Sequence, residues 1–215
     1  MQFDTIKAAL EYVGGMSKPS KMPCPSYSIP ATTCKFGKYL RTQCNSVCSD
    51  CYGMKGCYRF PVVKNALETR FSTLEKEGWV DAFIFAITKK KLSFFRWHDV
   101  GDLQSVEHFE KIVAVAVACP NCKFWLPTKE IAMVRTWLDK GNKLPENLNV
   151  RISAFFVDVF DQSFQSLADG MGCTVATVAT DSTRANCFAY QNDGACGDCR
   201  KCWNKDIPEV CYPKH

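Results

Sequence analysis

Residues 105–140 read SVEHFEKIVAVAVACPNCKFWLPTKEIAMVRTWLDK, and this stretch decides the predicted fold. Residues 105–118 and 129–140 have helical patterns, and the apolar run Phe124–Pro127 between them indicates a strand. The alternation continues outward, with further strands predicted at Leu92–Trp97, Val150–Phe156 and Thr174–Ala179 and a further helix near 161–168. A repeated strand and helix pattern is typical of an α/β fold with a parallel sheet, whose strands are apolar because both faces are covered.

The region before this alternation is predicted to be mostly irregular. Residues 4–13 read as a short helix with Asp4 as its N-cap, and residues 16–60 contain one strand candidate, Tyr27–Ile29. A second helical region is predicted from Pro61 to Lys90, broken near residue 78.

No linker divides the chain, so we predict one domain over residues 1–215. Its parts are an N-terminal helix and cysteine loop (1–60), a repeated β/α core (61–180) and a cysteine-rich tail (181–215).

Polar loops follow the predicted strands. They are residues 96–102, residues 128–130, Asp158 with Asp161, and residues 180–184. Any one of them can be explained by helix capping, for which Ser105 and Thr128 are suited. Because parallel strands end on the same rim, four such loops together indicate a functional site there.

Three cysteines, Cys44, Cys48 and Cys51, form a C-x3-C-x2-C run in the N-terminal loop. Three thiolates at this spacing suit an iron–sulfur cluster and leave one iron without a protein ligand. Cys34 offers an alternative, because a fourth thiolate would close the site and indicate electron transfer or a structural role instead of catalysis.

Four further cysteines, Cys187, Cys196, Cys199 and Cys202, form a second group in the tail. Four thiolates match a fully coordinated four-iron cluster, and a tetrahedral zinc ion is the alternative.

The composition favours metal binding over disulfides. The 215 residues include fourteen cysteines, and no secretory signal precedes them, so we expect a reducing cytoplasm. The longest apolar run, residues 112–119, is too short for a membrane span. The net charge of +5 comes from dispersed Lys and Arg, and the cluster at 89–91 is read as a solvated helix end; this permits a nucleic-acid partner without indicating one.

The remaining cysteines and the histidines are assigned lesser roles. Cys173 is expected to be core packing, and the pair Cys119 and Cys122 to be structural or half of a metal site. His98, on the rim, is a candidate proton handler, and His108 is expected on a helix surface. His215 either folds back onto the metal region or hangs free.

The chain resembles the phage gene product 88 family and, through its three-cysteine loop ahead of a β/α repeat, the radical SAM superfamily. The family resemblance rests on stretches in the order SIPATTC (28–34), CSDCY (48–52) with Lys55 and Gly56, RWHD (96–99) with Gly101 and Asp102, PTKE (127–130), CGDCRKCW (196–203) and YPKH (212–215).

The superfamily resemblance implies a partial (β/α) barrel-like parallel sheet, its C-terminal rim covered by the cysteine loop and tail. It implies a [4Fe-4S] cluster on Cys44, Cys48 and Cys51 that binds and cleaves S-adenosylmethionine. His98 and Asp99 would then be catalytic, and the cofactor would be bound by Asp99, Gly101, Asp102 and Lys129. This hypothesis also includes an auxiliary [4Fe-4S] cluster on the tail. It expects an electron donor and an unknown substrate as partners, and a location in the host cytoplasm. Its counterpart is a non-catalytic iron–sulfur or zinc protein that binds a partner.

Overall fold

The structure is a computed structural model that describes residues 1–214. Its main elements are α1 (Ile6–Tyr12), β1 (Ser26–Tyr27), α2 (Lys35–Leu40), α3 (Pro61–Thr73), α4 (Trp79–Lys89), β2 (Phe94–Trp97), α5 (Val106–Ala118), β3 (Lys123–Thr128), α6 (Ile131–Leu138), β4 (Leu148–Ser153), α7 (Gln162–Gly170), β5 (Thr174–Ala179) and β6 (Glu209–Pro213). Short 3₁₀ turns are η1 (Ala31–Thr33), η2 (Tyr52–Met54), η3 (Gly56–Arg59), η4 (Ser182–Arg184), η5 (Phe188–Gln191) and η6 (Lys201–Trp203). His215 lies outside the described residues, so both expectations for it stay predictions.

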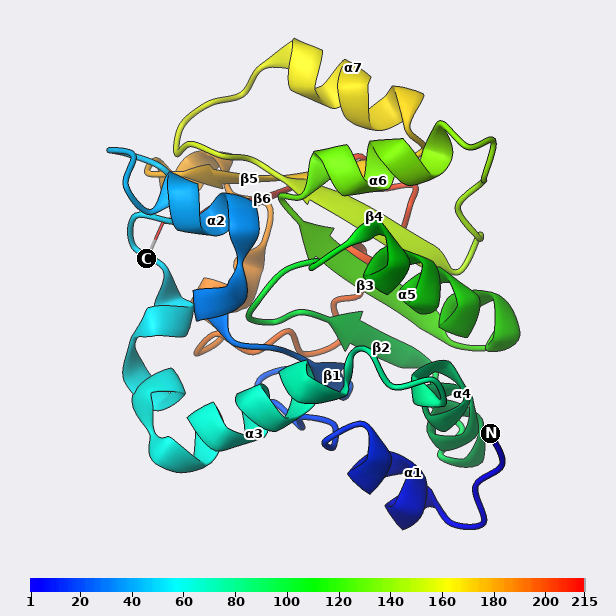
Figure 1. Cartoon of the computed structure of the whole chain (residues 1–215). Helices are drawn as coiled ribbons and strands as arrows, with labels where there is room; N and C mark the ends of the chain where they lie inside the picture. The colour runs from blue at the N-terminus through cyan, green and yellow to red at the C-terminus, as the bar shows by residue number, and fades with distance from the viewer. Residues whose placement is uncertain (215) are drawn as a thin grey trace.

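The six strands form one sheet in the order β1-β2-β3-β4-β5-β6, and every neighbouring pair is parallel. Since β2 to β5 each lie beside the preceding strand, right-handed crossovers place the helices that connect them on one face, whereas the segment between β5 and β6 runs over the other face. Figure 1 shows α6 and α7 above the sheet, α5 at its right and α4 at its lower right, with the strands ending toward α2. The predicted α/β fold is therefore confirmed, in the strand order expected of a barrel that has not closed.

An aromatic core joins the sheet to α4 and α5. Tyr27, Phe95 and Trp97 point from the first two strands toward the fully buried Trp79 and Phe83 of α4. The Trp79 and Trp97 rings stack with centroids 5.6 Å apart. Burying rings of this size contributes the largest apolar area available to any side chain, so this cluster fixes β1 and β2 against the helices.

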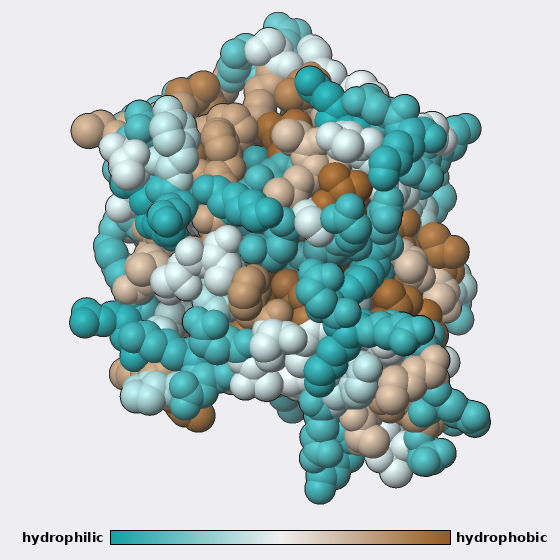
Figure 2. All heavy atoms as spheres, in the orientation of Figure 1, coloured by the Kyte–Doolittle hydropathy of each residue, from teal (hydrophilic) through white to brown (hydrophobic). Residues whose placement is uncertain are grey.

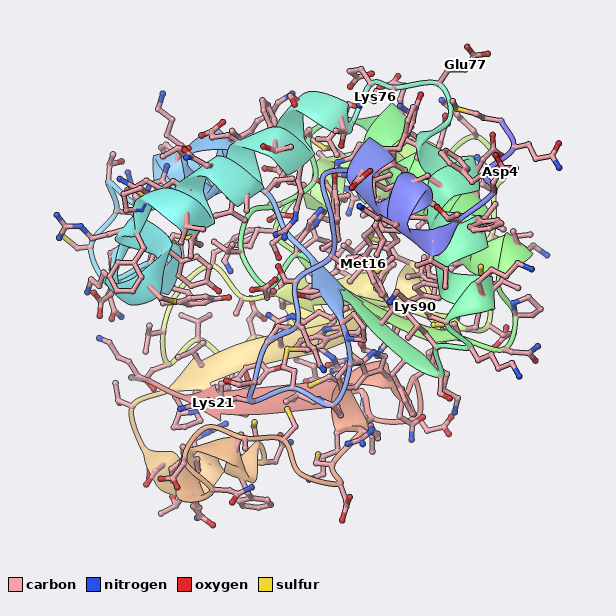
Figure 3. All side chains as sticks on the ribbon, turned by 90° about the horizontal axis from the view of Figure 1, so that it is seen from below. Asp4, Met16, Lys21, Lys76, Glu77 and Lys90 are labelled. Atoms are coloured by element: carbon pink, nitrogen blue, oxygen red, sulfur yellow. The ribbon has the colours of Figure 1, made fainter. Side chains whose placement is uncertain are left out.

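The tail covers the opposite face of the sheet, as seen below the strands in Figure 3. Trp203 packs its ring 5.3 Å from that of Trp125 and donates its indole N–H to the Phe95 carbonyl at 2.8 Å. The fully buried Arg151 donates to the carbonyls of Val175, Lys201 and Ile207. The chain then returns as β6, so both ends of the tail are fixed to the sheet.

Several local expectations need correction. Thr5, not Asp4, caps α1, because its hydroxyl accepts the Ala8 N–H one turn ahead. We expected the tail to cover the C-terminal rim, whereas its η6 turn packs on the inner face against β3 and β4. The strand Glu209–Pro213 was not predicted, since its pairing with β5 depends on the tail crossing the sheet. Ser105 caps α5 as predicted, and α3 and α4 separate near Gly78 as predicted.

Candidate metal centres and the rim of the sheet

Two thiols of the N-terminal region, those of Cys34 and Cys48, lie beside Gly37, and the thiol of Cys51 is close enough to raise the pKa of both. Burial is the main cause that raises the pKa of Cys34 to about 12, and the charges of Asp102, Cys51 and Cys48 contribute in the same direction. A Cβ built on Gly37 would lie 3.8 Å from the Cys34 sulfur and 3.7 Å from that of Cys48, and 3.1 Å from the Cys34 Cβ. Glycine at this position therefore lets the α2 backbone pass close to two cysteine side chains that lie side by side.

The cysteine loop is held against the end of β4. Val47 donates its N–H to the Phe155 carbonyl at 2.8 Å, and Val157 donates to the Asn45 carbonyl at 3.0 Å. The buried Ser46 hydroxyl donates to the Leu40 carbonyl at 2.5 Å, which joins the loop to α2. The C-x3-C-x2-C run thus lies at the C-terminal rim of the sheet, where the topology places reactive loops.

Residues of the loop after β3 lie beside α2 and the N-terminal cysteines. The buried Glu130 carboxylate accepts the Phe36 N–H at 2.8 Å, which fixes the start of α2 directly after Cys34. The Lys129 and Arg41 charges lower the pKa of Cys48, although burial raises it more. Positive charge beside the thiols favours their thiolate form, which is the form that binds metal.

Cys44 differs from the other members of its motif. Its side chain is exposed, and the thiols that influence one another here are those of Cys34, Cys48 and Cys51. Within residues 1–214, no three Cys, His, Asp or Glu side chains lie close enough together to hold a metal ion.

The tail thiols form a second group on the face of the sheet opposite helices α4 to α7. Cys187 and Cys199 raise the pKa of Cys196, and Cys187 raises that of Cys202, in each case after burial as the main cause. Cys24, which the sequence did not single out, belongs to this group, because it packs with Trp125 and Trp203 and its pKa is raised by burial and by Cys196.

Arg96 of β2 faces these tail thiols. Its guanidinium lies 4.2 Å from the Trp125 ring centroid, and its charge lowers the pKa of Cys24 and Cys196, against the larger effect of burial. The Cys202 sulfur lies 3.3 Å from the Tyr212 hydroxyl. A partly buried cation therefore lies where thiolates would need a compensating positive charge.

The two aspartates of the loop after β2 have different surroundings. Asp102 is buried, and its carboxylate accepts from the Thr128 hydroxyl at 2.6 Å and from the N–H groups of Leu103 and Lys129, which partly offset the rise in its pKa caused by burial. Both oxygens are thus used in joining the loops after β2 and β3.

Asp99 is half-buried and lies between β1 and η3. Its Oδ1 accepts from the hydroxyls of Ser26 and Ser28, and its Oδ2 accepts from Tyr58 at 2.9 Å. Since a carboxylate oxygen has two acceptor positions, Oδ2 retains one for a ligand.

His98 and His108 are buried, and Gly101 packs closely against backbone. His98 is 2% exposed, and its ring lies 5.3 Å from that of His108, which is also 2% exposed and therefore not on the helix surface as expected. Gly101 has φ +84°, and a Cβ there would approach the Ile29 carbonyl oxygen to 2.6 Å. Close backbone packing is reason enough for glycine at this position.

The other cysteines lie apart from both groups. Cys57 is exposed on η3, while Cys119, Cys122, Cys173 and Cys211 are buried. Cys173 is core packing as predicted. All fourteen cysteines are free thiols in the described part of the chain.

Sequence reasoning missed Cys24 and Tyr58 as neighbours of the candidate site, and it placed Arg96 in the rim loop 96–102, whereas its side chain faces the tail thiols. Arg96 carried a signal, since a charged residue inside an otherwise apolar strand must face a polar partner. Cys24 and Tyr58 lie in irregular segments, so nothing local indicated where they would fold.

Comparison with known proteins gives one match. A family model described as "Gene product 88" matches residues 4–205. No curated protein and no solved structure matches the chain. Within residues 1–214, no helix is both long enough and apolar enough to span a membrane.

Proposed function

We propose that this chain, which belongs to the gene product 88 family, is an iron–sulfur protein with a cluster at the C-terminal rim of its sheet. The observation that carries the proposal is that the thiols of Cys34 and Cys48 lie side by side next to Gly37, with Cys51 near both. Thiols from two separate segments meet there next to Lys129 and Arg41, whose charges favour thiolates. A second four-iron cluster, or a zinc ion, is proposed for the tail on Cys187, Cys196, Cys199 and Cys202.

The proposal includes S-adenosylmethionine as the ligand of the rim cluster. A cluster with an open iron supplies the electron that breaks the sulfonium bond of this cofactor. Asp99 is the better acceptor for the cofactor's amino group, because it is half-buried and within reach of a ligand, whereas Asp102 is buried and joins the loops after β2 and β3.

Whether the cluster is open depends on Cys34 and Cys44. If all four thiols of the N-terminal region bind, the cluster is closed, and the chain is an electron-transfer or structural protein. The position of Cys34 beside Cys48 favours this second candidate, whereas an exposed Cys44 that stays free restores the open site.

The test is anaerobic cluster assembly on single variants. Wild-type protein should bind about eight irons if both groups hold four-iron clusters. Cys48→Ala should lose the rim cluster, whereas Cys57→Ala, a matched change at an exposed cysteine, should keep it. Colourless wild-type protein with bound zinc and without iron contradicts the proposal.

Paired variants then separate the open from the closed cluster. If Cys44→Ala keeps the cluster and Cys34→Ala loses it, the three ligands are Cys34, Cys48 and Cys51, and the reverse result restores the C-x3-C-x2-C set. An electron paramagnetic resonance signal of the reduced cluster that changes on adding S-adenosylmethionine supports the enzyme, and an unchanged signal supports the second candidate.

A further inference from the structure

The positive charge of the chain is concentrated in one segment. Residues 35–64 hold six of the 27 Lys and Arg but one of the 22 Asp and Glu, so the remaining 21 bases and 21 acids balance. The whole net charge of +5 therefore belongs to α2, the cysteine loop, η2, η3 and the start of α3. From the sequence we described the charge as dispersed and overlooked this segment, because its Lys and Arg residues are separated by apolar residues.

The same segment exposes large apolar side chains. Tyr39 is 58% exposed, Phe60 59% and Val62 74%. Of the eleven large hydrophobic side chains that are exposed, five lie between residues 39 and 62. Exposed rings that gather in one region usually mark a binding surface.

These side chains lie along one edge of the molecule. Figure 1 places α2, η2, η3 and the start of α3 along the edge to which the strands point, and Figure 2 shows hydrophilic and hydrophobic atoms intermixed there. We call this surface, made of residues 35–41 and 52–64, the basic-aromatic edge.

We propose that the basic-aromatic edge binds single-stranded nucleic acid. Lys35, Lys38, Arg59 and Lys64 are exposed, and none has an ion-pair partner in the described residues, so all four are available to phosphates. Exposed rings provide stacking platforms for bases. Bases of a duplex are already stacked on one another, so this combination fits an unpaired strand.

Other occupants fit the edge less well. Insertion into a membrane surface requires an apolar face separated from the charged face, whereas here Lys and Arg side chains alternate with aromatic side chains. An acidic protein would use the charges but would leave the exposed rings without a flat partner. The proposal does not depend on the proposed cluster, since the side chains that carry it are those of the protein itself.

The test measures the binding of labelled oligo-dT and oligo-U of about 20 nucleotides to the metal-loaded protein by fluorescence anisotropy. Four phosphate contacts predict a slope of about −2.8 in log affinity against log salt, and therefore about a 50-fold loss of affinity between 50 and 200 mM salt. A slope near zero, or equal binding of duplex and single strand, overturns the proposal.

A matched pair of charge reversals locates the surface. The variant Lys38→Glu, Arg59→Glu, Lys64→Glu should lose at least about tenfold in affinity. Its control, Lys89→Glu, Lys90→Glu, Lys91→Glu, makes the same change in net charge at the exposed end of α4 and should lose less than about threefold. Equal losses contradict a specific edge.

A variant without a change in charge tests the surface even if the triple charge-reversal variant fails to fold. Tyr39→Ala should weaken binding about fivefold or more and leave the salt slope unchanged, because it removes a stacking ring but no phosphate contact. If this variant binds as wild type, or if polyglutamate or anionic vesicles displace the protein from the oligonucleotide better than unlabelled strand does, the proposal fails.

Discussion

The buried histidine pair predicts how stability should depend on pH. Burial lowers the pKa of His108 to about 3, and burial together with the neighbouring His108 lowers that of His98 well below its usual 6.5. Three of the four ring nitrogens, both of His98 and Nε2 of His108, have no hydrogen-bond partner in the described residues, so nothing compensates a proton there. Both rings are therefore neutral in the folded chain at neutral pH.

The sign and size of the effect follow from linkage. Below pH 6.5 these histidines bind protons in the unfolded chain but not in the folded chain. The free energy of unfolding is therefore highest above pH 6.5 and decreases as the pH falls toward the folded pKa. At pH 5 the neutral His108 costs about 2 kcal/mol of stability, because that pH lies 1.5 units below the unfolded pKa and each unit is worth about 1.36 kcal/mol. His98 contributes in the same direction, because its pKa is also lowered by burial.

The assay compares urea unfolding of wild type and His108→Phe at pH 7 and pH 5, with the same metal loading in both proteins. The free energy of unfolding should fall by about 2 kcal/mol more in wild type than in the variant. Comparing the two proteins cancels the opposite contributions of Asp102 and Glu130, whose pKa values burial raises. An identical pH dependence in both proteins would show that His108 is not held neutral and would refute the reasoning.

Three further outcomes are expected. Trp203→Ala removes the contact with Trp125 and the hydrogen bond to Phe95, so urea unfolding should show a loss of about 3–5 kcal/mol, with faster proteolysis of residues 185–205; unchanged proteolysis would contradict the packing of the tail. Gly101→Ala places a Cβ against Ile29 in a left-handed conformation, and its thermal midpoint should fall by an amount equivalent to more than about 1 kcal/mol, whereas Gly141→Ala, with no neighbour, should lose less. Because burial raises the pKa of most of the tail thiols, anaerobic metal loading should be faster at pH 8.5 than at pH 6.5, and equal rates would contradict thiols that must first lose protons.

The alternation of apolar strands and helices was predictable because each unit buries its own residues locally. Thr174–Ala179 was predicted with the bounds that the structure shows, since six apolar or β-branched residues in succession favour a buried strand. The strand Glu209–Pro213 was not, because it ends in proline and pairs only after the tail has crossed the sheet.

The candidate site was predictable in part. The two cysteine groups are visible as local spacing, but the approach of Cys34 to Cys48 and of Cys24 to the tail depends on how irregular segments fold. The burial of His108 had a signal that we did not use: it shares a helical face with Ile112 and Val115, both buried.

The order of the strands has a consequence for aggregation. A sheet that does not close keeps two edges, and unpaired backbone groups on an edge can template pairing with another molecule. Here one edge is β1, which is two residues long, and the other is β6, which ends at Pro213, a residue without an amide hydrogen. Both edges are thus poor templates, which lets an open sheet rich in apolar strands resist edge-to-edge association with its copies.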